Sequence, residues 1–163
     1  MAEKDWYAAV EAKLGEQLFG VVDEVYLETG ATKGFSESVK AAIPAGREIV
    51  FSFLRRRPDI LGYVNRAYSK DLITVEVKEK SLTIEDIYQA KMYKEVFGAR
   101  YGFLVTTTAI PEALKRLCKQ THQIQHSSHD DTYSFLAIAE FHRASGFVEW
   151  FEENPFSKDF YWT

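Results

Sequence analysis

Residues 71–107 read DLITVEVKEKSLTIEDIYQAKMYKEVFGARYGFLVTT, and this stretch decides the fold. In residues 71–78, apolar and polar side chains alternate, which is typical of a β-strand. Residues 101–107 are mostly apolar, as expected of a strand that is buried on both faces. Apolar residues at helical spacing lie between the two segments. The stretch therefore predicts a right-handed βαβ unit, in which a helical crossover joins two parallel strands.

The helix of this unit has recognisable ends. Thr83 is followed three residues later by Asp86, which is the spacing of a capping box. Gly98 follows the last apolar residue of the pattern, and glycine commonly ends helices because it adopts the left-handed conformation easily. The sequence thus predicts a helix from about residue 84 to residue 97.

Further elements extend outward from this unit on both sides. Their patterns predict a helix over residues 5–19, a helix or a strand over 21–27, a short helix over 36–43, a strand over 48–54, a strand over 55–64 that forms a hairpin with 71–78, a helix after Pro111, a strand over 133–139 and a last helix over 146–153. Together they predict a single α/β domain with a mixed β-sheet flanked by helices, in which an antiparallel meander leads into the parallel crossover.

Length and composition limit the class of protein. The chain has 163 residues, which suits one domain, and 46% of them are apolar, enough to fill a core. No apolar run approaches the roughly 20 residues of a membrane span, and the N-terminus lacks the pattern of a secretion signal. Cys118 is the only cysteine, so neither an intrachain disulfide nor a cysteine-based zinc site is expected. These features predict a cytoplasmic protein that does not enter the membrane.

Charge is distributed unevenly along the chain. The net charge is −4, yet residues 47–119 hold 14 Lys and Arg against 9 Asp and Glu, which gives +5 there and −9 in the two ends. The basic middle suits a nucleic-acid partner. The acidic ends suit the docking of a partner chain.

Three residues on the predicted hairpin could carry chemistry. Glu76 and Lys78 share one face of their strand because side chains alternate. Taken alone, this pattern is also that of any half-exposed strand. Asp59 follows Pro58 at the start of the preceding strand, where a hairpin would bring its carboxylate next to that of Glu76. Two such carboxylates can bind magnesium, a hard cation that prefers oxygen ligands.

A magnesium site of this kind suits phosphodiester hydrolysis. The reaction needs a metal-polarised phosphoryl oxygen, an oriented and partly deprotonated water, and stabilisation of the leaving oxygen. Lys78 could orient or activate that water and offset the charge on the phosphate. Next to a metal ion its pKa would be depressed, as a general base requires.

The order of these motifs resembles a known superfamily. Pro58-Asp59, then Glu76-Val77-Lys78, then the segment from Gln89 to Tyr93 are similar to the motif series of the PD-(D/E)XK nucleases. The last segment resembles the Q-x-x-x-Y motif of their RecB-type branch. The similarity covers about residues 47–107, and it implies a restriction-endonuclease-like fold.

The resemblance also implies a role for each residue. Asp59, Glu76 and the carbonyl group of Val77 would bind Mg²⁺, or Mn²⁺ in its place, and Lys78 would be catalytic. Gln89 would act in the catalytic site. Tyr93 would support the site or contact the nucleic acid, although its position also suits the core.

Members of the family carry a further glutamate on the first helix, which completes the metal shell. Glu11 and Glu16 compete for this role. We favour Glu11 because it borders the buried stripe of the predicted helix, although either residue could be an ordinary surface residue.

Basic residues near these motifs could contact phosphates. Arg55, Arg56 and Arg57 directly precede Pro58, and Lys80 and Lys91 belong to the same unit. A solvated basic strand edge would explain any single arginine equally well. DNA is favoured over RNA only because the resemblance is to a family whose members commonly act on DNA.

Other residues have simpler explanations. His122, His126 and His129 have spacings that could suit a metal ion, but they also suit a solvated loop. Cys118 is expected to face the core of a helix. The aromatic tail around Trp162 is expected to pack on the body or on a second copy, so a homodimer is a further expectation.

The sequence therefore predicts a magnesium-dependent nuclease, with DNA as the favoured substrate. The alternative is a catalytically inactive module of the same fold that binds nucleic acid or assembles with other proteins. A third reading, an interaction protein, requires Asp59 and Glu76 to be far apart. Any helicase or specificity function would come from a partner chain.

Overall fold

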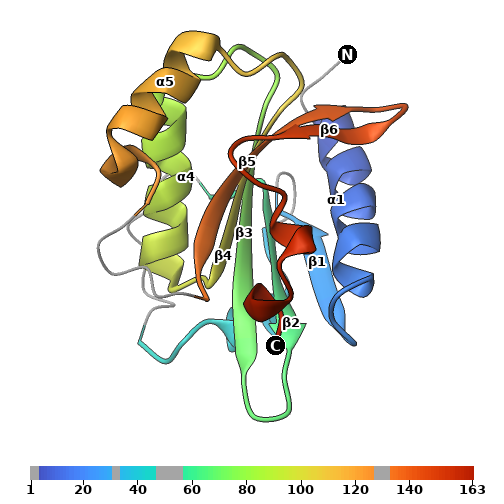
Figure 1. Cartoon of the computed structure of the whole chain (residues 1–163). Coiled ribbons are helices and arrows are strands. Elements are labelled where there is room, and N and C mark those ends of the chain that lie inside the picture. The colour runs from blue at the N-terminus through green and yellow to red at the C-terminus, as the bar shows by residue number, and fades with distance from the viewer. Residues whose placement is uncertain (1–3, 31–33, 47–56, 127–132) are drawn as a thin grey trace.

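Within residues 4–30, 34–46, 57–126 and 133–163, which the computed structural model describes, six strands form one mixed β-sheet (Figure 1). The strands are β1 (Val25–Thr29), β2 (Ile60–Asn65), β3 (Lys70–Lys78), β4 (Tyr101–Thr106), β5 (Phe135–His142) and β6 (Gly146–Trp150). They lie side by side in chain order. β3, β4 and β5 run parallel, whereas β1, β2 and β6 are antiparallel to their neighbours. The predicted antiparallel meander and parallel crossover are therefore confirmed.

Helices cover both faces of the sheet (Figure 1). The helix α1 (Lys4–Phe19) packs its buried residues Tyr7, Val10, Leu14 and Leu18 against one face. The helices α2 (Glu37–Ala42), α4 (Ile84–Phe97) and α5 (Glu112–Gln120) pack against the other face. The short helical turns η1 (His122–Ile124), η2 (Pro155–Ser157) and η3 (Asp159–Tyr161) complete the described elements.

The central strand β3 is buried between these two layers. Ile73, Val75 and Val77 belong to the core cluster that contains α1. Leu72 belongs to the cluster that contains residues of α2 and α4. Because side chains alternate, Glu76 shares the side of Leu72 and lies under α4 rather than in solvent.

The expected ends of α4 are confirmed. The side chain of Thr83 accepts a hydrogen bond from the backbone of Asp86, and the side chain of Asp86 accepts one from the backbone of Thr83. Gly98 adopts the left-handed conformation with φ of 66° and ends the helix. These two caps set where α4 begins and ends above β3.

The helix predicted over residues 146–153 is wrong. Residues Gly146–Trp150 form β6, an antiparallel partner of β5, and the chain then turns at Phe151. Gly146 has a φ of 79°, which suits the tight connection from β5. A short apolar segment fits a helix or a strand equally well by its spacing, and here pairing with β5 decided the outcome.

Three other expectations are resolved or lie outside the described residues. The ambiguous segment over 21–27 contains the start of β1, so a strand is correct. The predicted strand over 133–139 begins at Phe135 and extends to His142. The predicted strand over 48–54 lies outside the residues that the structure describes.

The aromatic C-terminal tail packs on the body of the protein, as expected. Trp162 is buried, with its ring centroid 4.7 Å from Tyr101 and 5.2 Å from Phe156. Arg66 donates a hydrogen bond to the carbonyl group of Trp162. Cys118 is buried in α5, as predicted. Among the described residues, none of the helices combines the length and the hydropathy that crossing a bilayer requires.

Candidate functional site

The hairpin of β2 and β3 attaches Asp59 to the strand that carries Glu76. Ile60 pairs with Val75, so Asp59, one position earlier, comes opposite Glu76. Oδ2 of Asp59 accepts a hydrogen bond of 2.7 Å from the backbone N–H of Val77. The interaction-protein reading required Asp59 and Glu76 to be far apart, and the pairing of β2 with β3 does not meet that requirement.

Lys78 connects the carboxylate of Glu76 to α4. Its Nζ atom lies 2.7 Å from Oε1 of Glu76 and donates a 3.1 Å hydrogen bond to Oε1 of Gln89. Nε2 of Gln89 in turn donates to the hydroxyl group of Tyr93 at 3.2 Å. The side chain of Glu76 is only 5% exposed and that of Lys78 only 12%, so this polar chain is shielded from solvent.

This arrangement makes Lys78 a stable cation. Burial alone would lower its pKa, but the hydrogen bond and charge of Glu76, and then the charge of Asp59, outweigh burial and raise the pKa above its usual value. The depressed pKa expected beside a metal ion is thus not a property of the Glu76–Lys78 pair itself. Lys78 is arranged here as a charge-balancing group.

Tyr93 is the last member of this chain of hydrogen bonds. Its ring is 1% exposed and belongs to the core cluster under α4. Burial raises the pKa of its hydroxyl group, and the charges of Glu76 and Asp59 act in the same direction, so the hydroxyl stays protonated. The position suits support of Gln89 rather than direct contact with nucleic acid.

The loop after β3 is fixed by the start of α4. Lys80 forms a 3.0 Å ion pair with Asp86, and the carbonyl group of Lys80 accepts a hydrogen bond from Thr106 of β4. Burial would raise the pKa of Asp86, but hydrogen bonds from Thr83 and Lys80 outweigh it and lower that pKa. The capping box is visible in the sequence, whereas the Lys80–Asp86 pair depends on the path of the loop and is not.

Glu11 lies in a different environment from Asp59 and Glu76. With Glu16 it lines a surface cavity of about 380 Å³ between α1 and β1, whose other lining residues are mainly apolar. Burial, and then the charge of Glu28 on β1, raise the pKa of Glu11. In the described part of the chain, no three or more His, Cys, Asp and Glu side chains form a group that could hold a metal ion. The role of Glu11 as a third acidic ligand stays a prediction.

The basic residues predicted to contact phosphate have different surroundings. Arg57 is exposed, while Arg55 and Arg56 lie outside the residues that the structure describes. Lys80 is engaged with Asp86 but its side chain remains 58% exposed. Lys91 donates a hydrogen bond of 2.9 Å to the carbonyl group of Gln123. Arg57 and Lys80 are thus accessible to a ligand.

Comparisons with protein-family models, with curated proteins and with solved structures find no match to this chain. The chemistry of the site rests on its own residues. These provide two neighbouring carboxylates, a buried ammonium group and an amide, held on two strands and one helix. Such a set can bind a hard cation and balance negative charge on a bound phosphate.

Proposed function

We propose that this protein is a metal-dependent nuclease that hydrolyses phosphodiester bonds, with DNA as the favoured substrate. The observation that carries the proposal is a set of hydrogen bonds that links Glu76 and Lys78 of β3 to Gln89 of α4, and that links Asp59, which directly precedes β2, to the backbone of Val77. The sequence motifs alone predict these four side chains as one catalytic group. The order of strands and helix around them supports a restriction-endonuclease-like core.

The donor atoms fit Mg²⁺. Asp59, directly before β2, and Glu76 of the neighbouring strand β3 offer carboxylate oxygens, and the carbonyl group of Val77 follows Glu76 in β3. Oxygen donors of this kind suit Mg²⁺, or Mn²⁺, and leave positions for water and a phosphate oxygen. When bound, the ion would polarise the phosphoryl group and lower the pKa of a coordinated water.

The side chains of the protein would perform the remaining tasks. The ammonium group of Lys78 would offset the negative charge that develops on the phosphate. Gln89 holds Lys78 from the side of α4, and Tyr93 fixes the orientation of the Gln89 amide. Because Glu76 and Lys78 are shielded from solvent, their charges act more strongly than they would in water.

A cleavage assay tests the proposal. Supercoiled, linear duplex and single-stranded DNA are incubated with Mg²⁺ or Mn²⁺ and either the wild-type protein or Asp59→Ala, both purified identically. We expect cleavage that requires the metal and that the variant loses. Equal behaviour of the two proteins would assign any cleavage to contamination and would favour the inactive, nucleic-acid-binding alternative.

A further inference from the structure

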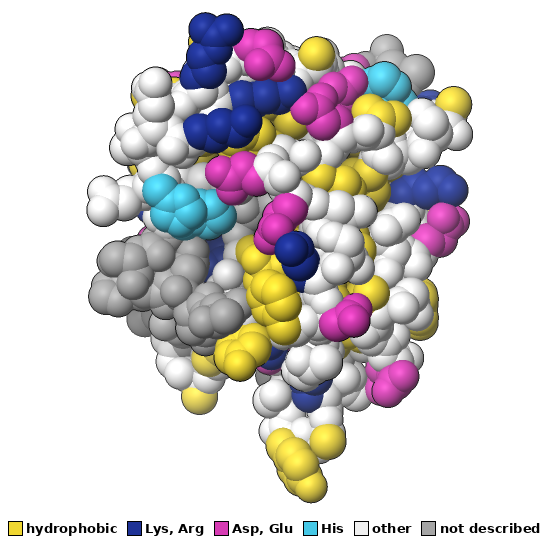
Figure 2. Space-filling model, in the orientation of Figure 1, with side chains coloured by type: hydrophobic (Ala, Val, Ile, Leu, Met, Phe, Trp, Pro, Cys, Tyr) yellow, Lys and Arg dark blue, Asp and Glu magenta, His cyan; other side chains and the backbone are white. Residues whose placement is uncertain are grey.

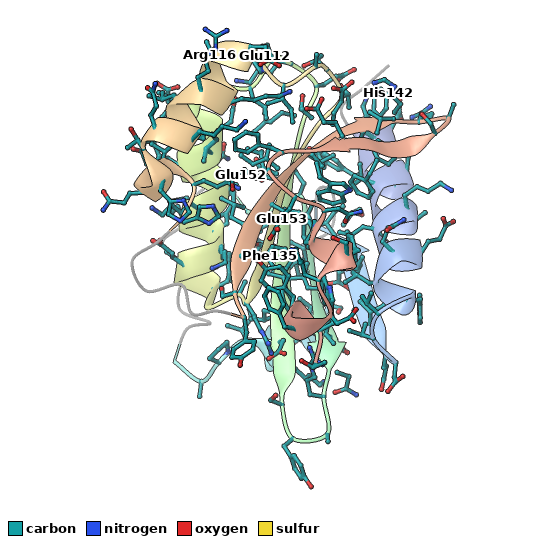
Figure 3. All side chains as sticks on the ribbon, in the orientation of Figure 1. Glu112, Arg116, Phe135, His142, Glu152 and Glu153 are labelled. Carbon is teal, nitrogen blue, oxygen red and sulfur yellow. The ribbon has the colours of Figure 1, made fainter. Side chains whose placement is uncertain are left out.

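A small cavity lies where η1 meets the loop that follows β6. Its lining includes Gln125, His126, Phe135, Leu136, Phe151 and Glu152, and its volume is about 40 Å³. We call it the Gln125 cavity. Figure 3 labels Glu152 on the loop after β6 and Phe135 on the adjoining strand. The volume is enough for one metal ion with a water molecule, because one water needs only about 10–15 Å³ by this measure.

Gln125, which lines this cavity, carries a buried polar atom that calls for a partner. The side chain is 3% exposed, and its Nε2 atom donates a 2.7 Å hydrogen bond to the carbonyl group of Leu136. This bond requires the amide nitrogen at that position, which fixes Oε1 on the other side of the amide. Within the described residues, Oε1 is buried and has no hydrogen-bond partner. A buried oxygen without a hydrogen-bond partner is a suitable position for a bound water molecule or metal ion.

His126 and Glu152 face each other at the same cavity. Nε2 of His126 lies 3.6 Å from Oε2 of Glu152. This separation is longer than a good hydrogen bond, but it suits two ligands of one Zn²⁺ ion, each about 2.0–2.2 Å from the metal. The ring of His126 is stacked on that of His122, with centroids 4.1 Å apart, which restrains its orientation. Figure 2 shows a group of histidine side chains on this face with acidic side chains near it.

The backbone at Glu152 is strained. Its φ of 68° is the one positive value among the described residues other than glycine. A left-handed conformation is uncommon for glutamate, and it persists where the surrounding structure requires it. The Glu152 carboxylate lies opposite His126 at this strained turn.

We propose that His126, Glu152 and Oε1 of Gln125 bind a divalent transition-metal ion of the Zn²⁺ class, with water completing the shell. Imidazole and carboxylate ligands suit this class of ion, and four-coordinate sites with one water position are common for Zn²⁺. The described residues contain no group of three or more His, Cys, Asp and Glu side chains that could hold a metal ion. The proposed site is of a different kind, because its third protein ligand is the amide oxygen of Gln125. The ion would connect the α5–η1 segment to the loop after β6. The proposal does not depend on nuclease activity.

Titration with Co²⁺ tests the site, because bound Co²⁺ has visible absorption bands and is displaced by Zn²⁺. The wild-type protein is stripped of metal and titrated in excess Mg²⁺, so that the oxygen ligands of the Asp59–Glu76 site are occupied. We expect one equivalent of Co²⁺ to bind and Zn²⁺ to displace it. Removal of one ligand, in Glu152→Gln or His126→Gln, should weaken binding at least about tenfold, since even loss of an outer-shell partner costs 10–100-fold.

Two control variants make the result specific. His142→Gln alters a second histidine–glutamate pair, in which Nε2 of His142 lies 2.7 Å from Oε1 of Glu140, and it should bind Co²⁺ like the wild type. Cys118→Ala removes the only thiol and should also leave binding unchanged. The proposal is overturned if the wild type binds no Co²⁺, if Glu152→Gln and His126→Gln bind it normally, or if binding disappears in either control.

A stability measurement guards against variants that fail to fold. Zn²⁺ should raise the midpoint of thermal unfolding of the wild type, because a ligand that binds only the folded state stabilises it. Glu152→Gln should show an ordinary unfolding transition that Zn²⁺ does not shift. An equal shift in the wild type and in Glu152→Gln would contradict the proposal. Loss of DNA cleavage in Asp59→Ala has no bearing on this result, so the two proposals fail separately.

Discussion

The backbone N–H of Val77 donates a 2.7 Å hydrogen bond to Oδ2 of Asp59. A residue that precedes β2 is thereby attached to β3, between the two side chains that carry opposite charges, Glu76 and Lys78. The bond gives Asp59 a structural task in addition to the catalytic one that we propose. Substitutions of Asp59 therefore have to separate its structural role from its proposed catalytic role.

Asp59→Asn and Asp59→Ala make that separation. Asparagine keeps an oxygen that can accept the hydrogen bond from Val77, whereas alanine removes the acceptor. We expect Asp59→Ala to lose about 1–3 kcal/mol of unfolding free energy, and Asp59→Asn to lose less. Both variants should lose metal-dependent cleavage because both lose the carboxylate. Urea denaturation and the cleavage assay check this, and full activity in Asp59→Asn would contradict the role of Asp59.

The pair of Glu76 and Lys78 is expected to show strong coupling in stability. Lys78→Met would leave the buried carboxylate of Glu76 without its 2.7 Å cation contact. Breaking a buried pair in this way costs about 3–5 kcal/mol. The double variant Glu76→Gln, Lys78→Met should recover part of that loss. A double-mutant cycle by urea denaturation measures the coupling, and additive effects would show that the two charges do not depend on each other.

Asp86 predicts how stability depends on pH at the acidic end. Hydrogen bonds from Thr83 and Lys80 outweigh the effect of burial and lower the pKa of Asp86 in the folded state. Its contribution is therefore complete above the unfolded value of about 3.9 and is lost as the pH falls through the folded value. The difference in unfolding free energy between the wild type and Asp86→Asn should be constant near pH 6 and shrink below about pH 4.

The exposed neighbour Glu85 provides the control for this measurement. Glu85→Gln makes a matched change in the same helical turn and should alter stability by less than about 0.5 kcal/mol. If the Asp86→Asn difference stays the same down to pH 2, the lowered pKa of Asp86 is not present.

The C-terminal tail is expected to contribute substantially to stability. Trp162 is 4% exposed and stacks with Phe156, whereas Phe160 is 41% exposed. Trp162→Ala should cost about 3–5 kcal/mol, the range for a large buried aromatic residue. Phe160→Ala is the matched control and should cost much less. Similar losses in the two variants, measured by urea denaturation, would show that the tail does not pack as described.

The sequence predicts best the features that depend on neighbouring residues. The capping box of Thr83 and Asp86 and the stop at Gly98 are local signals, and they located α4 correctly. The alternation in residues 71–78 and the apolar character of 101–107 likewise located β3 and β4. Strand β6 was mistaken for a helix because its short apolar pattern does not contain the information that β5 lies beside it.

Prediction of the candidate site was limited in the same way. The spacing of Glu76 and Lys78 places both side chains on one face of β3, but it does not predict that α4 covers this face. The contact between Lys78 and Gln89 depends on how α4 packs across β3, so the sequence suggested the residues without the hydrogen bonds. The surroundings of Glu11 depend on the packing of α1, which brings its carboxylate under the influence of the charge of Glu28.

The most direct test of the proposed catalytic centre compares Glu76→Gln with Glu79→Gln. The two changes are identical in chemistry and lie three residues apart, but Glu79 is exposed and interacts with Trp6 rather than with Lys78. Metal-dependent DNA cleavage is measured for both variants beside the wild type, with folding checked by circular dichroism. We predict that Glu76→Gln loses cleavage and that Glu79→Gln retains it. Cleavage that persists in folded Glu76→Gln would contradict the proposed centre.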